Sequence, residues 1–528
     1  MSEKKESKFK KWIKLLKENP VSPKLKRISW IANFAAVVAF IFLHIVLWYF
    51  VSYKNYLLLD YVPVGIIIVP EILLLIAVIF PFLIKFGRKR TYISITISLV
   101  VAVALFVTGI WGIAFNKSIK DFISSFDNAV TTISNNSKVS TDDYNVFVQK
   151  TDPAHDLADT ADYTFGVVNN YDVDDMHSVV LMCEDALKKP IKLKKFNDVA
   201  ELAEGLIQKK CQAIIVDDSL MSMIVEAGDT TDDDKNNGPY ANFSKSLKIV
   251  KGFSVKNELA PMDDPGNVSK RCFNVFLSGI DTGGDVTNKS QSDVNVILSI
   301  NPNTNTIVGV STPSDYYVPL SISGTEKDKL CYAGNYGIDV SMKTLSFFYG
   351  IDIDYYVRMN FTGFKDIIDE LGGIDVESDY AFETHGYKFK KGMNKNLNGD
   401  QALWFARERK SLKKGDVSRS NNQMKVIEAV IEKTSTSSIL SDYKEILKNI
   451  SESFQTNMSK NTMKSIVKMQ VSKGDKWKIH LYSVSGKNGV ETTFSIPSLK
   501  QHVLIPNTKT VKKATKYFKQ NKFGKKIK

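Results

Sequence analysis

Apolar residues gather into three long stretches near the start of the chain, at about residues 30–51, 57–84 and 92–115. Each stretch reaches the roughly 20 residues that an α-helix needs to cross a bilayer. A cleavable signal peptide fits poorly, because the first stretch is too long and two more follow it. The pattern therefore predicts three transmembrane helices within residues 29–115.

Lysine and arginine residues are unevenly distributed around these stretches. Residues 1–28 carry ten of them, and the connection between the second and third stretches carries four between Lys85 and Arg90, whereas the first connection has only Lys54. Basic segments tend to remain on the cytoplasmic side of a membrane. We therefore expect a cytoplasmic basic segment at 1–28 and a multi-pass protein of the cell membrane whose main domains are extracellular.

Glu71 lies inside the second apolar stretch. An intramembrane carboxylate can belong to an ion or proton path, and the alternative is a protonated side chain satisfied by a neighbouring helix. Three spans before a large domain are more typical of an anchor than of a transporter.

The segment after the third stretch is polar at first and then alternates between strand and helix patterns. Residues 116–160 include a cluster of Ser, Asn and Thr and are predicted to form a stalk. Residues 161–262 are predicted to form a small α/β accessory domain. Its expected strands are 164–170 and 211–218, and its expected helices are 175–189 and 196–210.

A second α/β pattern fills residues 263–508. The last segment, 509–528, holds nine lysines and no acid. Outside the cell this basic tail would bind anionic lipid or polymer rather than nucleic acid. The alternative is a solvent-exposed terminal helix with no binding role. Within 263–508, apolar runs predict strands at 274–281, 293–302 and 306–313, a strand, helix and turn at 350–378, and an amphipathic helix at 421–434.

Composition narrows the class of protein. At 528 residues, the chain exceeds the roughly 250–300 at which a single core stops growing, so two or more domains are expected. Its 44% hydrophobic and 24% charged residues exclude a wholly disordered chain. Four cysteines without CxxC spacing exclude a disulfide scaffold, and the six scattered histidines form no zinc motif.

Carboxylates and arginines in the second α/β region form the candidate chemistry. Asp281 ends one predicted strand and Asp293 opens the next, so the two side chains are placed to share a divalent cation. Arg407 and Arg409 are two residues apart, which would aim both to one face of an extended segment. Four residues separate Arg419 from Gln423, which a helix would align. Because guanidinium groups bind phosphate in bidentate fashion, this set suits a pyrophosphate; surface salt bridges are the alternative.

Residues 274–507 resemble the LytR-CpsA-Psr (LCP) family of Gram-positive wall-polymer ligases. The resemblance rests on "FLSGID", "SDVNVILSINP", "STPSDYYVPL", "IDYYVRMNFTGFKDIIDELGGIDV", "NGDQALWFARER" and "GDVSRSNNQ", in this order and spacing. Three apolar spans and an accessory domain before this region are similar to the capsule-linked branch of the family. The implied fold class is α/β: three transmembrane helices, a small α/β accessory domain and an α/β/α sandwich LCP domain.

The resemblance also implies an activity. A family member would move a glycopolymer, such as a capsule polysaccharide or teichoic acid, from a polyprenyl-pyrophosphate carrier to peptidoglycan, with Mg²⁺ at the mouth of an apolar tunnel. Membrane lipid is a further expected partner, nucleic acid is not, and homo-oligomerisation through the membrane helices is left open. By position, the resemblance implies that Asp281 and Asp293 are catalytic carboxylates that bind the metal. It implies a catalytic role for Arg407 and Arg409. Arg419 and Gln423 would bind the pyrophosphate. The implied tunnel walls are Val294–Ile300, Leu345–Phe348 and Phe361–Leu371.

Two positions depart from the family pattern. Gln291 and Ser314 stand where the family has arginines, while Asp315 is retained, and these three are also expected to contact substrate. Each lost charge-assisted contact costs on the order of 1.5–3 kcal/mol, and Lys289 is a nearby candidate to compensate. The departures favour an alternative function, a non-catalytic polyprenyl-phosphate or wall-polymer binding protein that regulates envelope assembly. A solute-sensing receptor ranks below both.

Overall fold

The computed structural model divides the chain into two compact units, residues 1–127 and 128–528, which are described separately. The structure describes residues 21–52, 64–83, 88–136, 138–169, 171, 173–231, 237–259, 264–266, 268–280, 286–409, 411–412, 416–434, 453–473 and 477–527.

The first unit is helical. It contains α2 (Pro23–Ser52), α3 (Val64–Leu83) and the first part of α4 (Arg88–Asn136). Among the described residues, two segments are long and apolar enough to cross a membrane, Pro23–Val46 and Arg88–Trp111, and Ile72–Leu83 is a shorter apolar helix. The second predicted span, 57–84, falls partly outside the described residues, and so does the side chain of Glu71.

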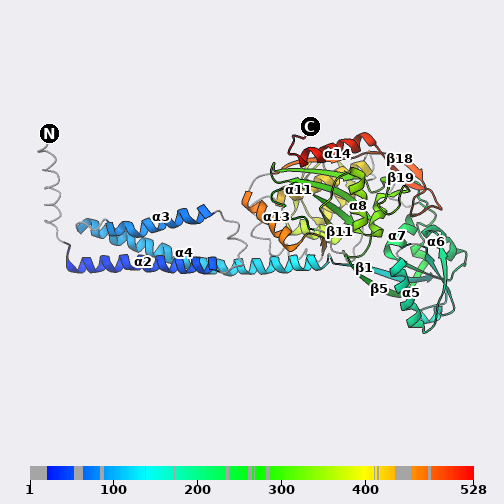
Figure 1. The fold of residues 1–528 in the computed structure, drawn as a ribbon, viewed down its shortest axis with the longest axis horizontal. Helices are drawn as coiled ribbons and strands as arrows, with labels where there is room; N and C mark the ends of the chain where they lie inside the picture. Colours follow the sequence, from blue (N-terminus) through cyan, green and yellow to red (C-terminus); the bar gives the residue numbers. More distant parts are fainter. Residues whose placement is uncertain are drawn as a thin grey trace. The chain divides into compact units, whose positions relative to one another are not determined.

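The accessory domain, residues 138–259, is built on a five-stranded sheet of order β3-β2-β4-β1-β5 (Figure 1). Strand β2 runs parallel to β3 and β4, whereas β1 runs antiparallel to β4 and β5. Helix α5 packs in one hydrophobic cluster with this sheet, and α6 and α7 pack in another. The bounds are β1 Val139–Gln149, β2 Thr164–Val168, α5 Val173–Leu187, β3 Lys192–Phe196, α6 Val199–Ile207, β4 Ala213–Asp217, α7 Asp218–Glu226 and β5 Leu247–Glu258.

The predicted stalk at 116–160 is wrong over its second half, because β1 is a central strand of the accessory sheet. Alternate residues of β1 are buried, from Ser140 and Asp142 to Tyr144 and beyond. The buried positions of its first half are polar, which hid the strand from hydrophobic pattern analysis. The expected strands and helices between 164 and 218 are confirmed within a few residues.

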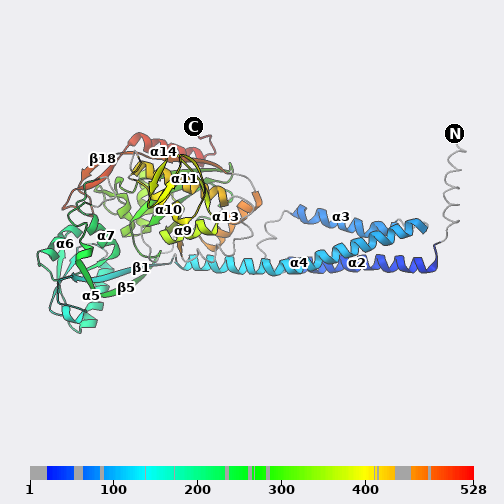
Figure 2. The ribbon, with the colours of Figure 1, turned by 180° about the vertical axis from the view of Figure 1, so that it is seen from behind.

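The C-terminal domain, residues 264–527, is built on a six-stranded mixed sheet of order β16-β11-β6-β7-β8-β17. Alternate residues of β7 point to opposite faces: Ile297 packs in the cluster with α8 and α14, and Val296 packs with Met424 of α11. Helices α9 and α10 join α11 in a further cluster on that side (Figure 2). The mixed α/β class is thus confirmed, with helices on both faces of the sheet.

The expected strands and helices of this domain are also confirmed. Their bounds are β6 Phe273–Ile280, β7 Ser292–Asn301, β8 Thr306–Thr312, α8 Ile338–Tyr349, β11 Tyr355–Asn360, α9 Phe361–Glu370, α10 Gly399–Arg407, α11 Asp416–Thr434, β16 Phe454–Thr456, β17 Lys478–Ser483 and α14 Thr508–Lys522. Shorter or peripheral elements are β9 Tyr317–Pro319, β10 Lys327–Lys329, η3 Leu330–Tyr336, β12 Ile374–Ser378, β13 Phe382–Thr384, β14 Tyr387–Phe389, β15 Gly392–Leu397, α13 Lys460–Lys473, β18 Gly486–Glu491 and β19 Gln501–Pro506.

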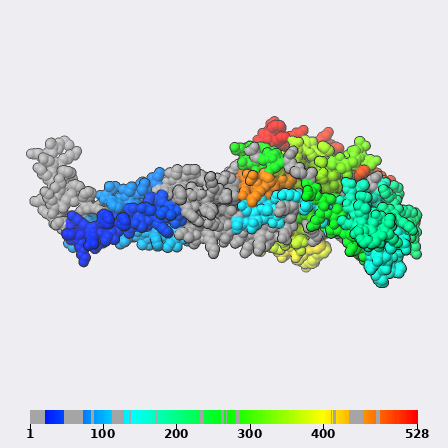
Figure 3. All heavy atoms as spheres, turned by 60° about the horizontal axis from the view of Figure 1, so that its bottom comes forward, coloured from blue at the N-terminus to red at the C-terminus, as the bar shows by residue number. Residues whose placement is uncertain are grey.

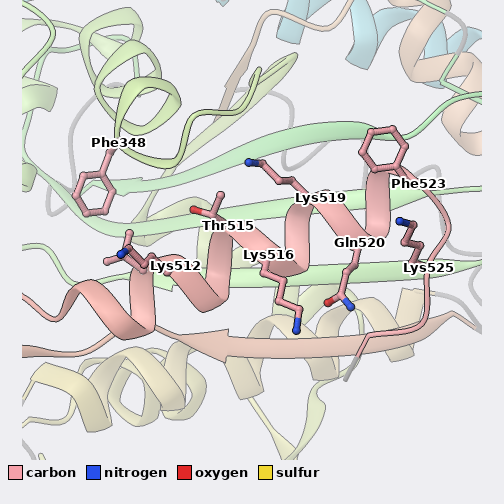
Figure 4. A pocket seen from close by; sticks show the side chains of 9 residues that line it. Phe348, Lys512, Thr515, Lys516, Lys519, Gln520, Phe523 and Lys525 are labelled. Carbon is pink, nitrogen blue, oxygen red and sulfur yellow. The ribbon is translucent and has the colours of Figure 1, made fainter.

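The basic segment 509–528 is not a separate tail. Helix α14 buries Ala514 and Phe518 against the sheet, and it lies at the surface of the domain (red in Figure 3). Its amphipathic spacing explains both properties, since the lysines fall between the buried positions. Figure 4 shows Lys516 and Lys519 pointing away from the helix beside an open groove of about 570 Å³.

A buried ionic cluster joins the accessory domain to the C-terminal domain. Lys289, in the connection between β6 and β7, places its Nζ 3.0 Å from Asp142 Oδ2 and 3.4 Å from Asp175 Oδ2. Asn257 donates to both oxygens of Asp175 at 2.7 Å. Burial raises the pKa of Asp142, Lys289 offsets part of that effect, and the resulting pKa is about 7.

This cluster predicts a pH-dependent stability. Between about pH 4 and 7 the folded protein holds a proton on Asp142 that the unfolded chain has released, so stability falls as the pH rises through that window. Asp142→Asn, which mimics the protonated side chain, should reduce this fall. Thermal unfolding of the full chain at pH 5 and pH 8 measures it, with exposed Asp185→Asn as the control. A variant that keeps the wild-type pH dependence would contradict the assignment.

Candidate active site

A polar cavity of about 470 Å³ opens at one end of the C-terminal sheet. Its walls come from the start of β7, the segment after β8, strands β10 and β19, helices α10 and α11, and the end of α7 in the accessory domain. The polar and aromatic side chains along these walls include Glu226, Asp229, Gln291, Asp293, Ser314, Asp315, Lys329, His385, Trp404, Arg407, Glu408, Arg409, Arg419, Gln423 and His502.

Every predicted site residue that the structure describes lines this cavity: Asp293, Arg407, Arg409, Arg419, Gln423, Asp315, Gln291 and Ser314. Asp281 follows the end of β6 and lies outside the described residues. The last residue of β6, Ile280, pairs with Ser292 at the start of β7. The metal-binding roles of Asp281 and Asp293 remain predictions.

The segment that carries Arg407 is helical rather than extended. Helix α10 begins with a capping box, in which Asn398 and Gln401 each bond to the other's backbone N–H, and Arg407 is its last residue. The Arg407 guanidinium lies 4.2 Å from the ring centroid of Phe361 and 5.4 Å from that of Trp404. The prediction of one extended face for Arg407 and Arg409 is therefore wrong, although both residues reach the cavity.

Helix α11 carries Arg419 and Gln423 one turn apart, as the sequence spacing predicted. Nη2 of Arg419 donates to Oγ of Ser314 at 2.8 Å. Ser314, where the resemblance expects an arginine, thus contacts an arginine of the cavity.

Asp315 is surrounded by basic side chains. Its oxygens lie 3.6 Å from Lys329 Nζ, 3.3 Å from Arg409 Nη2 and 3.7 Å from His502 Nδ1. Burial alone would raise the pKa of Asp315, but Lys329, His502, Arg409 and Arg419 together hold it well below its usual range. Asp315 is therefore a carboxylate that stabilises the cations of the cavity.

Lys329 is the principal residue that the sequence interpretation missed. It comes from β10, and burial would lower its pKa, but Asp315 and Glu226 raise that pKa above its ordinary value. Lys289, the proposed compensating cation, instead pairs with Asp142 and Asp175. No local pattern marked Lys329, Glu226 or His502, because tertiary folding brings them together from distant segments.

An aromatic wall borders the cavity beside Arg407. The rings of His385 and Trp404 are stacked, with centroids 3.4 Å apart and planes 15° from parallel. His385 lies in the turn between β13 and β14 with φ at 49°, so the hairpin presents this ring.

A second, apolar pocket of about 90 Å³ adjoins the polar cavity and shares four lining residues with it: Val294, Phe361, Arg407 and Gln423. Its other walls include Leu277, Phe364, Leu403, Val426 and Ile427. The expected wall at Leu345–Phe348 is misplaced, because Leu345 packs in the cluster on the opposite face of the sheet.

Three comparisons relate the chain to known proteins. Residues 228–514 match the LytR_cpsA_psr family. The polyisoprenyl-teichoic acid–peptidoglycan teichoic acid transferase TagU of Bacillus mycoides (strain KBAB4) is 35% identical over 226 residues, which cover 42% of this chain and 73% of TagU. TagU of Bacillus cereus (strain AH820) is 37% identical over 230 residues, with the same coverage. A crystal structure of B. subtilis TagV aligns with 30% identity and a TM-score of 0.41, over 49% of this chain and 99% of TagV.

The contacts predict different costs for removing the two arginines of the α10 segment. Arg409→Ala removes a charged partner of buried Asp315 and should destabilise the fold by about 1.5–3 kcal/mol. Arg407→Ala removes two cation–π contacts, with Phe361 and Trp404, and should cost about 1 kcal/mol. Denaturant unfolding measures both, and isothermal titration with inorganic pyrophosphate should show weaker binding in each variant. Equal losses of stability would contradict the distinction.

Proposed function

Because this chain belongs to the LytR_cpsA_psr family, we propose that it is a membrane-anchored phosphotransferase that moves a glycopolymer from a polyprenyl-pyrophosphate carrier to peptidoglycan. The relatives named as teichoic acid transferases support this activity. The observation that carries the proposal is the junction of a cation-lined polar cavity with an apolar pocket. A lipid pyrophosphate has the same two parts, a polyanionic head and an apolar chain.

The cations of the cavity match a pyrophosphate. Arg407, Arg409, Arg419 and Lys329 line it together, and guanidinium groups bind phosphate oxygens in pairs. Enzymatic phosphoryl transfer depends mainly on positioning and on neutralising the charge of the phosphates. Asp315 fixes Arg409 and Lys329 before substrate arrives, so these groups need little reorganisation.

The transfer exchanges one P–O bond for another. A peptidoglycan hydroxyl oxygen attacks the phosphorus that carries the glycopolymer, and the bond from that phosphorus to the bridging oxygen breaks. Polyprenyl monophosphate leaves with the bonding electrons, and a phosphodiester joins the polymer to peptidoglycan. The arginines and Lys329 stabilise the charge that moves onto the leaving phosphate.

The donor set is compatible with Mg²⁺. In the described part of the chain, no group of three or more His, Cys, Asp or Glu is arranged to hold a metal. Mg²⁺ is commonly bound by one or two carboxylates together with substrate phosphates and water, so Asp293 and Asp281 would hold it here. When bound, it would supply further charge neutralisation at the pyrophosphate.

The proposed anchor has three spans, with the N-terminus in the cytoplasm and residues beyond the third span outside. The two candidate spans, the apolar helix Ile72–Leu83 and the lysine and arginine bias support it. Contact with membrane lipid follows from the anchor, and homo-oligomerisation through these helices stays a hypothesis. A capsule polysaccharide or a teichoic acid would be the polymer.

A second candidate function is non-catalytic binding of a polyprenyl phosphate or wall polymer. Gln291 and Ser314 favour it, because both line the cavity at positions where the resemblance expects arginines. Lys329 favours the enzyme, since it supplies a cation in the same cavity.

Transfer by the full chain tests the enzyme directly. In nanodiscs that contain a polyprenyl-pyrophosphate-linked teichoic acid precursor, peptidoglycan should gain phosphodiester-linked polymer as polyprenyl monophosphate is released. Arg419→Ala should reduce kcat/KM on the order of 10- to 100-fold, the equivalent of about 1.5–3 kcal/mol. Lys516→Ala, on the exposed face of α14, is the control. Tight precursor binding without product would support the binding function instead.

Topology has a separate test. Protease added to intact protoplasts should digest the accessory and C-terminal domains but spare a tag placed at residue 1. Protection of both domains would contradict the proposed orientation.

A further inference from the structure

We propose that Glu226, supplied by the accessory domain, accepts the proton of the attacking hydroxyl group during polymer transfer. This inference rests on the proposed function and assigns a residue of the accessory domain to the reaction.

Packing fixes Glu226 at the cavity. It is the last residue of α7, whose first turn is capped by Asp217 through a 2.6 Å bond from Leu220 N–H. Leu220, Met223 and Ile224 of α7 pack in one cluster with Tyr332 and Ile496 of the C-terminal domain. The main chain after α7 is also tied to β19, because His502 N–H donates to the Asp229 carbonyl at 2.7 Å.

Glu226 lies outside the segment that matches the family, which begins at residue 228. Its carboxyl group lies beside the side chain of Gln291, where the resemblance expects an arginine. An arginine at 291 would form an ion pair with this carboxylate and reduce its ability to take a proton. The neutral amide of Gln291 forms no ion pair, so the Glu226 carboxylate can still accept a proton. The glutamine at position 291 and the base role of Glu226 therefore depend on each other.

Other acids of the cavity have different tasks. Asp315 is held ionised by its basic neighbours and is therefore a weak proton acceptor. The Asp229 carboxylate accepts hydrogen bonds from Thr231 N–H and Oγ1–H, at 2.9 and 2.7 Å. The Glu408 carboxylate accepts a hydrogen bond from Ser411 N–H at 2.7 Å. Asp293 is expected, from the family resemblance, to bind the metal.

The surroundings of Glu226 raise the pKa of its carboxyl group above the ordinary value. Burial raises its pKa, Lys329 partly offsets this, and Asp315 raises the pKa further. Tyr332 OH donates to Glu226 Oε2 at 3.3 Å, and Cys331 is a further titratable neighbour. A carboxylate with a raised pKa is a stronger base, so Glu226 is better suited than Asp315 to accept a proton.

The step balances without a redox partner. The hydroxyl oxygen forms its bond to the phosphorus of the glycopolymer phosphate as the bridging P–O bond breaks. The bonding electrons leave with polyprenyl monophosphate, and the hydroxyl proton passes to Glu226 and then to water.

Glu226→Gln in the full chain tests the proposal, because glutamine mimics the protonated carboxyl group. We expect kcat to fall on the order of 10²- to 10⁴-fold while KM for the lipid precursor changes little. The rise of kcat with pH, which reflects deprotonation of the base, should disappear. Inorganic pyrophosphate should bind at least as tightly as to the wild type, since a negative charge is removed from the cavity.

Two further variants separate the base from a structural role. Glu226→Asp should keep the rise of kcat with pH at a reduced rate, even if Glu226→Gln folds poorly. Asp218→Asn makes the same chemical change at the exposed start of α7 and should behave like the wild type.

The outcomes are distinguishable. Wild-type transfer with an unchanged rate and pH profile in Glu226→Gln would overturn the inference and leave the proposed function standing. Loss of the pH-dependent rise in Asp218→Asn as well would also overturn it. A wild-type chain that binds pyrophosphate but transfers nothing would overturn the proposed function and this inference with it.

Discussion

The carboxylate of Asp315 is the interaction on which the geometry of the cavity depends. Lys329 and Arg409 are both buried, and buried like charges repel strongly unless an anion lies between them. Asp315 contacts both and holds together the segment after β8, strand β10 and the segment that follows α10. Its own main chain is fixed by the bond from Leu504 N–H in β19. Substrate phosphates would therefore enter a site whose cations are already in place.

Sequence patterns predicted the parts of the fold that local hydrophobicity determines. Strands β6, β7 and β8 are rich in Val, Ile, Leu and Phe. Arg419 and Gln423 fall on one helix because their spacing is helical. The failures came from residues whose partners are distant. Strand β1 buries the polar residue Asp142, which forms an ion pair with the distant Lys289. No sequence pattern around Lys329 indicates a site, because its partner Asp315 lies on another segment. Arg407 lines the cavity as predicted, but its backbone is helical, because the capping box at Asn398 starts a helix that continues through Arg407.

The accessory domain is more than a spacer. It contributes Glu226 and Asp229 to the cavity wall, and through Asp142 and Asp175 it holds Lys289, which lies between β6 and β7. The same connection carries Asp281 and Gln291. The position of the accessory domain therefore affects which side chains line the cavity of the C-terminal domain, and the two domains form one functional unit.

Helix α14 has a consequence for how this protein completes its fold. Its Asn521 donates to the Ser299 carbonyl at 2.8 Å and accepts from Asn301 at 2.6 Å, across more than two hundred residues of chain. Contacts of such high sequence separation form late, because the entropy of closing the intervening loop must be overcome first. Until α14 has been synthesised, Ile297 and its apolar neighbours on that face of the sheet are not covered. Before that point the growing domain would expose an apolar sheet face of the kind that chaperones bind.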